Sequence, residues 1–238
     1  MKSLLLPLLL LFTFTLHAQS IKELQKKTNE CFNERNYECA EKAMKKLIKK
    51  DKKSPSMARY YSDLGTIQRR LGKRKEALNA YNKAIKLDNT RSVFFSNRAS
   101  LNRQIGNTED AVRDYKNAIE LDPDNYELRS DFAVFRKTLG ENKEALEDFN
   151  TLIELKPDEP VFYNNRADTK LRLGDHDGAL ADIEQGLSLD PDYLILYITL
   201  GEIHLDQGDT EKACHNFELA IDRGFDAKRI QSLLENCK

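Results

Sequence analysis

The fold is decided by the stretch Leu71–Tyr81, which reads LGKRKEALNAY, because its pattern recurs along the chain at a constant step of 34 residues. Each copy contains a glycine, and an alanine follows five residues later. The glycines are Gly72, Gly106, Gly140, Gly174 and Gly208, and the alanines are Ala77, Ala111, Ala145, Ala179 and Ala213. A fixed period of this length, without insertions, predicts an array of structural repeats.

Each repeat has the features of two helices joined by a short turn. Leu71 closes the first helix, and the glycine after it suits the left-handed conformation that ends helices, because glycine has no Cβ. Ala77, Leu78 and Tyr81 follow at helical spacing, and later copies end near a proline such as Pro123. One such hairpin is too small to bury its apolar face, so neighbouring repeats must stack on one another.

These features resemble those of the tetratricopeptide-repeat family. The third repeat meets the family pattern at Phe95, Ala99, Ala111, Tyr115, Ala118 and Pro123, and the sixth meets it at Tyr197, Leu200, Gly201, Ala213, Phe217 and Ala220. The chain departs from the pattern in having no tryptophan, in Asn89 at a proline position and in Gly186 at an alanine position. The resemblance implies an all-α, right-handed solenoid of about six helix-turn-helix repeats with a C-terminal capping helix.

Residues 1–18 are predicted to be a signal peptide. Lys2 precedes the apolar run Leu4–Leu16, and His17-Ala18 precedes a plausible cleavage point. The run is shorter than the roughly 20 apolar residues that span a bilayer, so an uncleaved anchor is the less favoured alternative. We therefore expect an exported protein, periplasmic or secreted and of bacterial origin, without a transmembrane span after signal removal.

The remaining chain divides into three predicted segments. Residues 19–57 form a degenerate first repeat with a basic linker, residues 58–227 form five regular repeats of 34 residues, and residues 228–238 form the capping helix. The linker, Lys49–Pro55, is interpreted as a solvated segment, and contact with an anionic surface is the alternative.

Four cysteines lie at the two ends of the array. Cys31 and Cys39 belong to the first repeat, whereas Cys214 and Cys237 belong to the last repeat and the cap. In an exported protein, the economical pairing is Cys31–Cys39 and Cys214–Cys237, although four cysteines allow three connectivities. A metal site built from Cys214, His215, His204 and Cys237 is the alternative.

The overall charge and the motifs exclude several classes of function. The chain has 38 Lys and Arg against 39 Asp and Glu, a balance that argues against a nucleic-acid partner. It has no nucleophile elbow, no phosphate-binding glycine loop and no His-Glu metal motif, so we expect a protein that is not an enzyme and needs no cofactor. The oligomeric state stays open.

By the resemblance, the first helices of the repeats line a concave groove that binds peptides. The residues assigned to this groove are Arg69, Arg70, Ser96, Asn97, Arg103, Lys137, Asn164, Asn165 and Arg172. Arg69, Arg103 and Lys137 form a predicted basic ladder over the second to fourth repeats, whereas Glu202 and Asp206 make the sixth repeat acidic.

We therefore expect an adaptor or scaffold that binds a peptide segment with an acidic stretch over the second to fourth repeats. Its apolar or basic part would lie over the fifth and sixth repeats. The opposing interpretation is that the ladder residues are paired with acids of neighbouring helices, as surface charges often are. Two other functions stay open, namely a structural subunit of a cell-envelope assembly packed through its repeat ends, and a metal-binding or enzymatic protein.

Overall fold

The computed structural model describes the backbone of residues 5–237 and the side chains of residues 18–237. The chain is 80% helical, and its described part contains no strand, which confirms the predicted all-α class. The predicted signal peptide, residues 1–18, lies outside the described side chains except for Ala18. Of the helices described, none is both long and apolar enough to cross a membrane.

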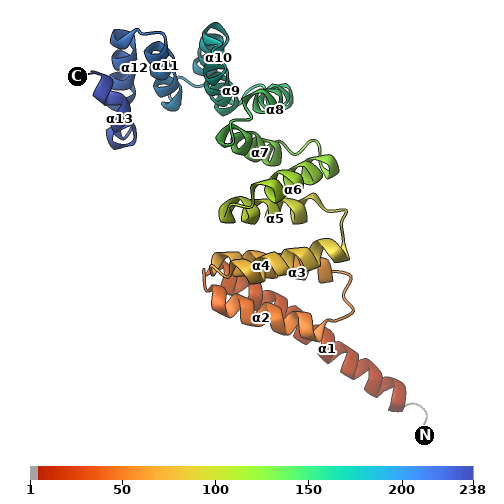
Figure 1. Ribbon diagram of the computed structural model, residues 1–238. Coiled ribbons are helices and arrows are strands. Elements are labelled where there is room, and N and C mark those ends of the chain that lie inside the picture. Colours follow the sequence, from red (N-terminus) through yellow and green to blue (C-terminus); the bar gives the residue numbers. More distant parts are fainter. Residues whose placement is uncertain (1–4, 238) are drawn as a thin grey trace. The chain divides into compact units, whose positions relative to one another are not determined.

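The helices form antiparallel pairs in chain order (Figure 1). The first helices of the pairs are α1 (Leu5–Asn33), α3 (Met57–Arg70), α5 (Ser92–Ile105), α7 (Tyr126–Thr138), α9 (Pro160–Arg172) and α11 (Ile195–Asp206). The second helices are α2 (Tyr37–Lys50), α4 (Arg74–Leu87), α6 (Thr108–Leu121), α8 (Asn142–Leu155), α10 (His176–Leu189) and α12 (Thr210–Asp222). Six hairpins of the predicted kind are therefore present in the described chain.

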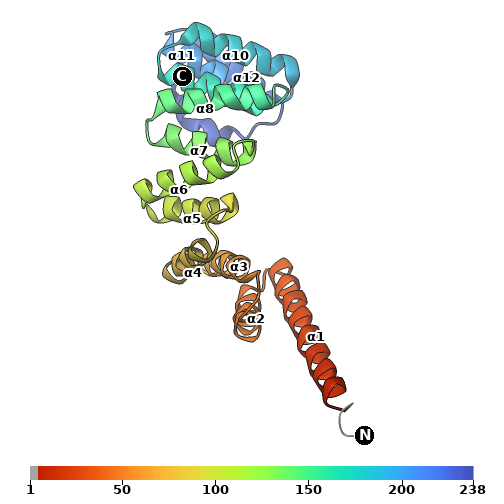
Figure 2. The same cartoon turned by 90° about the vertical axis from the view of Figure 1, so that its right-hand side faces the viewer.

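The pairs belong to two compact units, which we call the N-terminal half (Met1–Pro123) and the C-terminal half (Asp124–Lys238). In the N-terminal half, α2 packs on α3 and α4 packs on α5. In the C-terminal half, α8 packs on α9 and α10 packs on α11. Within each half, every second helix thus contacts the first helix that follows it. Figure 2 shows α1 extending beyond the end of α2.

The hairpin turns share one backbone geometry. The recurring glycines have left-handed φ values of 72° to 81°, as at Gly72 and Gly106. The amide of the next residue donates to the carbonyl five residues back, as from Lys73 to Gln68 at 2.9 Å. The first repeat makes the same turn with Arg35 at φ 58° and a bond from Asn36 to Cys31 at 2.8 Å. Arg35 therefore stands in a conformation that favours glycine.

The core of each hairpin is a small residue on the first helix facing a large one on the second. A Cβ built on Gly65 would lie 2.7 Å from the ring of Tyr81, so the two helices approach too closely there for a side chain. Gly201 meets the ring of Phe217 in the same way. The recurring alanines of the second helices, such as Ala77, are fully buried.

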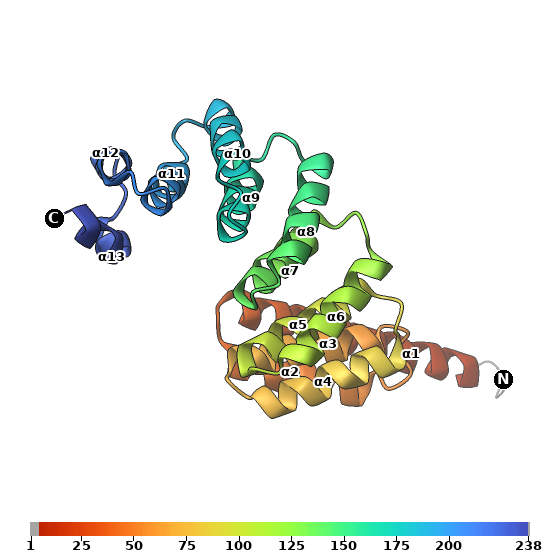
Figure 3. The ribbon, with the colours of Figure 1, turned by 45° about the horizontal axis from the view of Figure 1, so that its top comes forward.

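The predicted capping helix over residues 228–238 is not one continuous helix. The described residues form a 3₁₀ turn, η1 (Ala227–Ile230), a single α turn, α13 (Gln231–Leu234), and a second 3₁₀ turn, η2 (Glu235–Cys237). So short a segment has little helical stability of its own, and its ends are held by buried Ile230 and by Cys237, which lies at disulfide distance from Cys214. The segment packs beside α12, as Figure 3 shows, and so still covers the last repeat.

The turn geometry makes a prediction about stability. Arg35→Gly should raise the free energy of unfolding by about 1 kcal/mol, because it relieves a left-handed non-glycine residue. Gly140→Ala should lower it by about 1 kcal/mol, since φ is 79° there although space for a Cβ is open. Urea denaturation followed by circular dichroism measures both, with exposed Glu144→Ala as the control. A loss of stability in Arg35→Gly would contradict the assignment of the first turn.

Candidate functional site

In the N-terminal half, Arg69 and Arg70 lie in the last turn of α3 beside the hydroxyl of Tyr81. Burial raises the pKa of Tyr81, and the hydrogen bond to Thr66 and the two guanidinium charges oppose that rise. Arg70 is exposed and Arg69 half-buried. Neither guanidinium forms a hydrogen bond or ion pair with another described residue, so both are available to an anionic ligand.

The other predicted groove residues of this half lie on α5. Asn97 donates to Ser62 Oγ on α3 at 3.3 Å, so its amide links two successive first helices. Ser96 donates to the carbonyl of Val93 at 3.2 Å within its own helix. Arg103 is exposed in the last turn of α5.

In the C-terminal half, Lys137 is not an exposed, unpaired cation of the predicted basic ladder. Its Nζ lies 2.6 Å from Asp168 Oδ2 and donates to Asn165 Oδ1 at 3.1 Å, and only 13% of its side chain is exposed. Arg172 Nε lies 3.1 Å from the other oxygen of Asp168. The opposing interpretation, a charge paired with an acid of the next first helix, therefore describes Lys137.

The predicted ligand-binding asparagines of α9 also serve the fold. Asn164 is buried and accepts a hydrogen bond of 2.9 Å from Thr199 of α11, so it does not line an open surface. Asn165 accepts from Lys137 and donates to the carbonyl of Val161 at 2.9 Å. A residue one position away along a helix turns by about 100°, which separates a buried Asn164 from a partly exposed Asn165.

Glu202 belongs to the acidic surface that the sequence predicts over the sixth repeat. It lies on α11, is half-buried, and its carboxylate forms no hydrogen bond or ion pair with the described residues. Burial raises its pKa, as does the charge of Asp168, while Arg172 and Lys137 lower it. The first helices α7, α9 and α11 thus bring Lys137, Asp168, Arg172 and Glu202 into one cluster, which we call the charged cluster.

Sequence reasoning also missed a repeated set of buried carboxylates. Asp114, Asp148 and Asp182 lie 34 residues apart on second helices, and each is almost fully buried. Arg98 holds Asp114 through two bonds of 2.7 and 2.8 Å, and Arg166 holds Asp182 in the same manner at 2.6 and 2.9 Å. The regular spacing of the three aspartates was visible in the sequence. A helical pattern, however, does not predict which cation of the first helix pairs with which aspartate.

The fourth repeat forms this ion pair although its arginine and its aromatic residue have exchanged positions on the first helix. The third and fifth repeats have an aromatic residue three positions before the arginine, namely Phe95 before Arg98 and Tyr163 before Arg166. The fourth has Arg129 in the aromatic position and Phe132 in the arginine position. Arg129 and Arg136 nevertheless reach Asp148 at 3.1 and 2.6 Å, so the carboxylate keeps its cations.

The two halves carry opposite charge. Residues 1–123 contain 25 Lys and Arg against 14 Asp and Glu, a net charge of +11, whereas residues 124–238 contain 13 against 25, a net charge of −12. Several cations of the C-terminal half are used internally, as Arg129, Arg166 and Lys170 show. Acids without a neighbouring cation therefore remain on its surface. Although the total charge is near zero, the N-terminal half has a basic surface and the C-terminal half an acidic one.

The four cysteines lie in two pairs at disulfide distance. Cys31 faces Cys39 with a Cα separation of 5.7 Å, and Cys214 faces Cys237 with a separation of 5.6 Å. This pairing engages two of the four ligands of the alternative metal site. Among the residues whose side chains are described, no group of three or more His, Cys, Asp or Glu is arranged to hold a metal ion.

Comparison with known protein families identifies the repeats. Tetratricopeptide-repeat profiles match residues 58–91, 104–167 and 170–237, which together are well over half of the chain. The chain therefore belongs to the tetratricopeptide-repeat family. This family is a scaffold for protein interaction, which supports a protein or peptide as the partner. A comparison with curated protein sequences gave no match.

Several solved structures are similar to this chain. A tetratricopeptide repeat protein from Parabacteroides merdae is 28% identical, with a TM-score of 0.51, over 92% of this chain and 98% of that one. The C-terminal part of a repeat-containing protein from Cytophaga hutchinsonii has a TM-score of 0.71 at 17% identity, covering 83% of this chain and 78% of the other. YrrB, a repeat protein with an unusual peptide-binding site, has a TM-score of 0.63 at 20% identity, covering 76% and 92%. The last two likenesses show the solenoid fold alone.

The charged cluster makes a prediction about the titration of Glu202. NMR titration of its carboxyl carbon should give a pKa above the usual value, because burial and Asp168 disfavour the ionised form. Asp168→Asn should lower this pKa, and Lys137→Met should raise it further. Lys143→Met, which removes an exposed lysine of α8, should leave it unchanged. If both cluster substitutions moved the pKa in the same direction, the arrangement of these charges would be wrong.

Proposed function

We propose that this chain is an exported, non-enzymatic adaptor that binds segments of another protein on the first helices of its repeats. The observation that carries the proposal is Glu202, a half-buried carboxylate with no partner among the described residues. Membership of the tetratricopeptide-repeat family supports a protein partner. The peptide-binding site of YrrB is a precedent for a peptide ligand on this arrangement of helices.

The energetics of Glu202 favour a basic group in the ligand. An ionised carboxylate loses hydration when it is partly buried, and a hydrogen-bonded cation compensates that loss. Because the folded state favours its protonated form, ionisation of Glu202 as pH rises through its raised pKa costs stability. At neutral pH, a lysine or arginine of a bound segment would compensate for the hydration that the ionised Glu202 carboxylate loses.

The N-terminal half favours the opposite charge in its ligand. The guanidinium groups of Arg69 and Arg70 lie side by side in sequence at the end of α3, and this half has a net charge of +11. Arginine forms paired hydrogen bonds with carboxylates. We therefore assign the acidic stretch of the ligand to Arg69 and Arg70 rather than to a ladder that includes Lys137.

Peptide selection tests both contacts. A display library of 12-residue peptides is selected on residues 19–238, and the affinities of the selected peptides are measured by fluorescence anisotropy. Glu202→Gln should weaken basic peptides about tenfold or more, since a charged hydrogen bond contributes about 1.5–3 kcal/mol. Arg69→Glu with Arg70→Glu should weaken acidic peptides by a similar factor.

The matched controls change the same charges elsewhere on the surface. Glu218→Gln removes an exposed acid of α12, and Arg74→Glu with Lys75→Glu reverses two exposed cations at the start of α4. These variants should bind as the unchanged chain does. Equal binding by Glu202→Gln and Glu218→Gln would overturn the assignment of the basic contact, and the partner would then be sought through the repeat ends.

Export would place the four cysteines in an oxidising compartment, where both bonds would form. Mass spectrometry of the secreted chain should then find an N-terminus at Gln19 and four hydrogens fewer than the reduced form has. Replacing Cys214 and Cys237 by serine should lower stability by about 3 kcal/mol, and replacing Cys31 and Cys39 by about 2.5 kcal/mol, from separations of 23 and 8 residues. Free thiols in the secreted chain would contradict this part of the proposal.

A further inference from the structure

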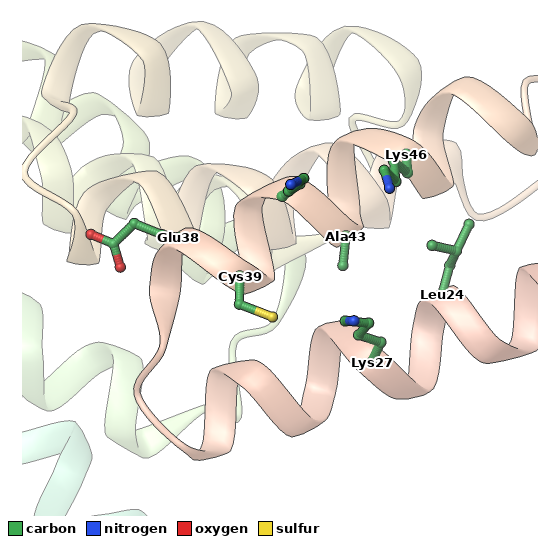
Figure 4. A pocket seen from close by; sticks show the side chains of 7 residues that line it. Leu24, Lys27, Glu38, Cys39, Ala43 and Lys46 are labelled. Atoms are coloured by element: carbon green, nitrogen blue, oxygen red, sulfur yellow. The ribbon is translucent and has the colours of Figure 1, made fainter.

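The first repeat contains an open cavity of about 430 Å³ between α1 and α2. Its floor is apolar, and its rim is basic. The floor is Leu24, Cys39 and Ala43, and the rim carries Lys27, Lys42 and Lys46, with Glu38 at the start of α2. Leu24 and Lys27 project from α1 into the space between the helices, whereas Glu38 points away from it (Figure 4).

The third and fifth repeats fill the equivalent place with an ion pair. Arg98 stands eight residues before the turn residue Gly106, and its partner Asp114 stands eight residues after it. In the first repeat, the residues eight positions before and after Arg35 are Lys27 and Ala43. The cation is therefore kept, but an alanine replaces the carboxylate that would hold it.

In the third and fifth repeats, the preceding second helix also lies over this place. Arg98 donates to Asn82 of α4 at 2.7 Å, and Arg166 donates to Asn150 of α8 at 2.9 Å. The aromatic residue three positions before each arginine is only 8% exposed. Leu24, which stands three positions before Lys27, is only partly buried, and no second helix precedes α1 in the described chain.

The lysines of the cavity have no partner of their own. Lys27, Lys42 and Lys46 are exposed, and none of them forms a hydrogen bond or ion pair with another described residue. They lie in the half of the chain that carries a net charge of +11. The first repeat thus retains the surface on which a second helix packs, has no such helix over it in the described chain, and presents positive charge to whatever covers it.

We propose that this cavity is the docking site for an acidic, amphipathic helix of another protein, which packs on α1 as α4 packs on α5. An apolar side chain of that helix would enter the floor, and its carboxylates would face Lys27, Lys42 and Lys46. The site is separate from Arg69, Arg70 and Glu202 and does not rest on the function proposed for them.

Two occupants from the chain itself fit less well. The N-terminal residues 1–18 contain no Asp or Glu, so they do not complement the lysines. The acidic helices of a second copy already pack their apolar residues in their own core, as Phe149 and Leu152 of α8 show by being fully buried. A free amphipathic helix of a different protein meets both requirements, the apolar and the acidic.

The chain offers its own probes for this site. A helix-stabilised peptide of Asn142–Leu155 reproduces α8, which has four acids against one lysine and packs on a first helix. The peptide Arg74–Leu87 reproduces α4, which packs equally on a first helix but has four cations against one acid. By fluorescence anisotropy on residues 19–238, the acidic peptide should bind at least tenfold more tightly than the basic one.

Two sets of variants locate the binding. Reversing the cavity lysines with Lys27→Glu, Lys42→Glu and Lys46→Glu should abolish binding of the acidic peptide. Reversing Lys49, Lys52 and Lys53, which are exposed but do not line the cavity, should change it less than twofold. Circular dichroism shows that each variant is folded.

Ala43→Asp gives a sharper test, because it supplies the missing carboxylate within the chain. It should pair with Lys27 as Asp114 pairs with Arg98, and weaken the acidic peptide about tenfold, whereas Ala43→Asn should not. Absence of binding, or equal binding of both peptides, would overturn the proposal. Binding to anionic phospholipid vesicles that only the triple cavity variant abolishes would also overturn the proposal, because the occupant would then be a membrane. Self-association in light scattering that only this variant abolishes would overturn it too, because the occupant would then be a second copy.

Discussion

The structure depends on the close approach of two helices at the centre of each hairpin. A first-helix glycine or alanine lies against a large side chain of the second helix, as Gly65 lies against Tyr81. The same arrangement places fully buried Ala99, Ala133 and Ala167 in the middle repeats. In the second to sixth repeats this contact leaves no room for a larger residue, so a glycine or alanine recurs there at the regular step of the sequence, whereas the first repeat has Thr28 at this position.

Buried ion pairs also join the two helices of the third, fourth and fifth repeats. The acids Asp114, Asp148 and Asp182 of second helices form ion pairs with cations of the first helices, so these charges belong to the interior of the third to fifth repeats. A buried carboxylate that lost its cation would be strongly destabilising, which explains why the fourth repeat keeps the pair with exchanged residues. The first repeat, with Ala43 in this place, is left with an unfilled basic cavity.

The same pairs shape the outer surface. In the C-terminal half, arginines and lysines that could neutralise exposed acids are held inside by Asp148 and Asp182. The charge available to a partner therefore differs from the charge of the composition. Lys137 illustrates this difference, since it is basic in sequence but neutralised by Asp168 in the fold. Arg69, Arg70 and Glu202, by contrast, form no hydrogen bond or ion pair with the described residues.

The sequence by itself determined the local structure. Glycine at the turn, apolar residues at helical spacing and a constant step specify helices, hairpins and the family, because these depend on residues close in the chain. Only the tertiary structure decided which polar side chains are available. Asn164 and Lys137 have the same sequence signature as open groove residues, but one is buried against Thr199 and the other is paired with Asp168. Helical spacing predicts the face on which a residue lies, whereas its partner depends on residues of another helix about 30 positions away, which no local pattern contains.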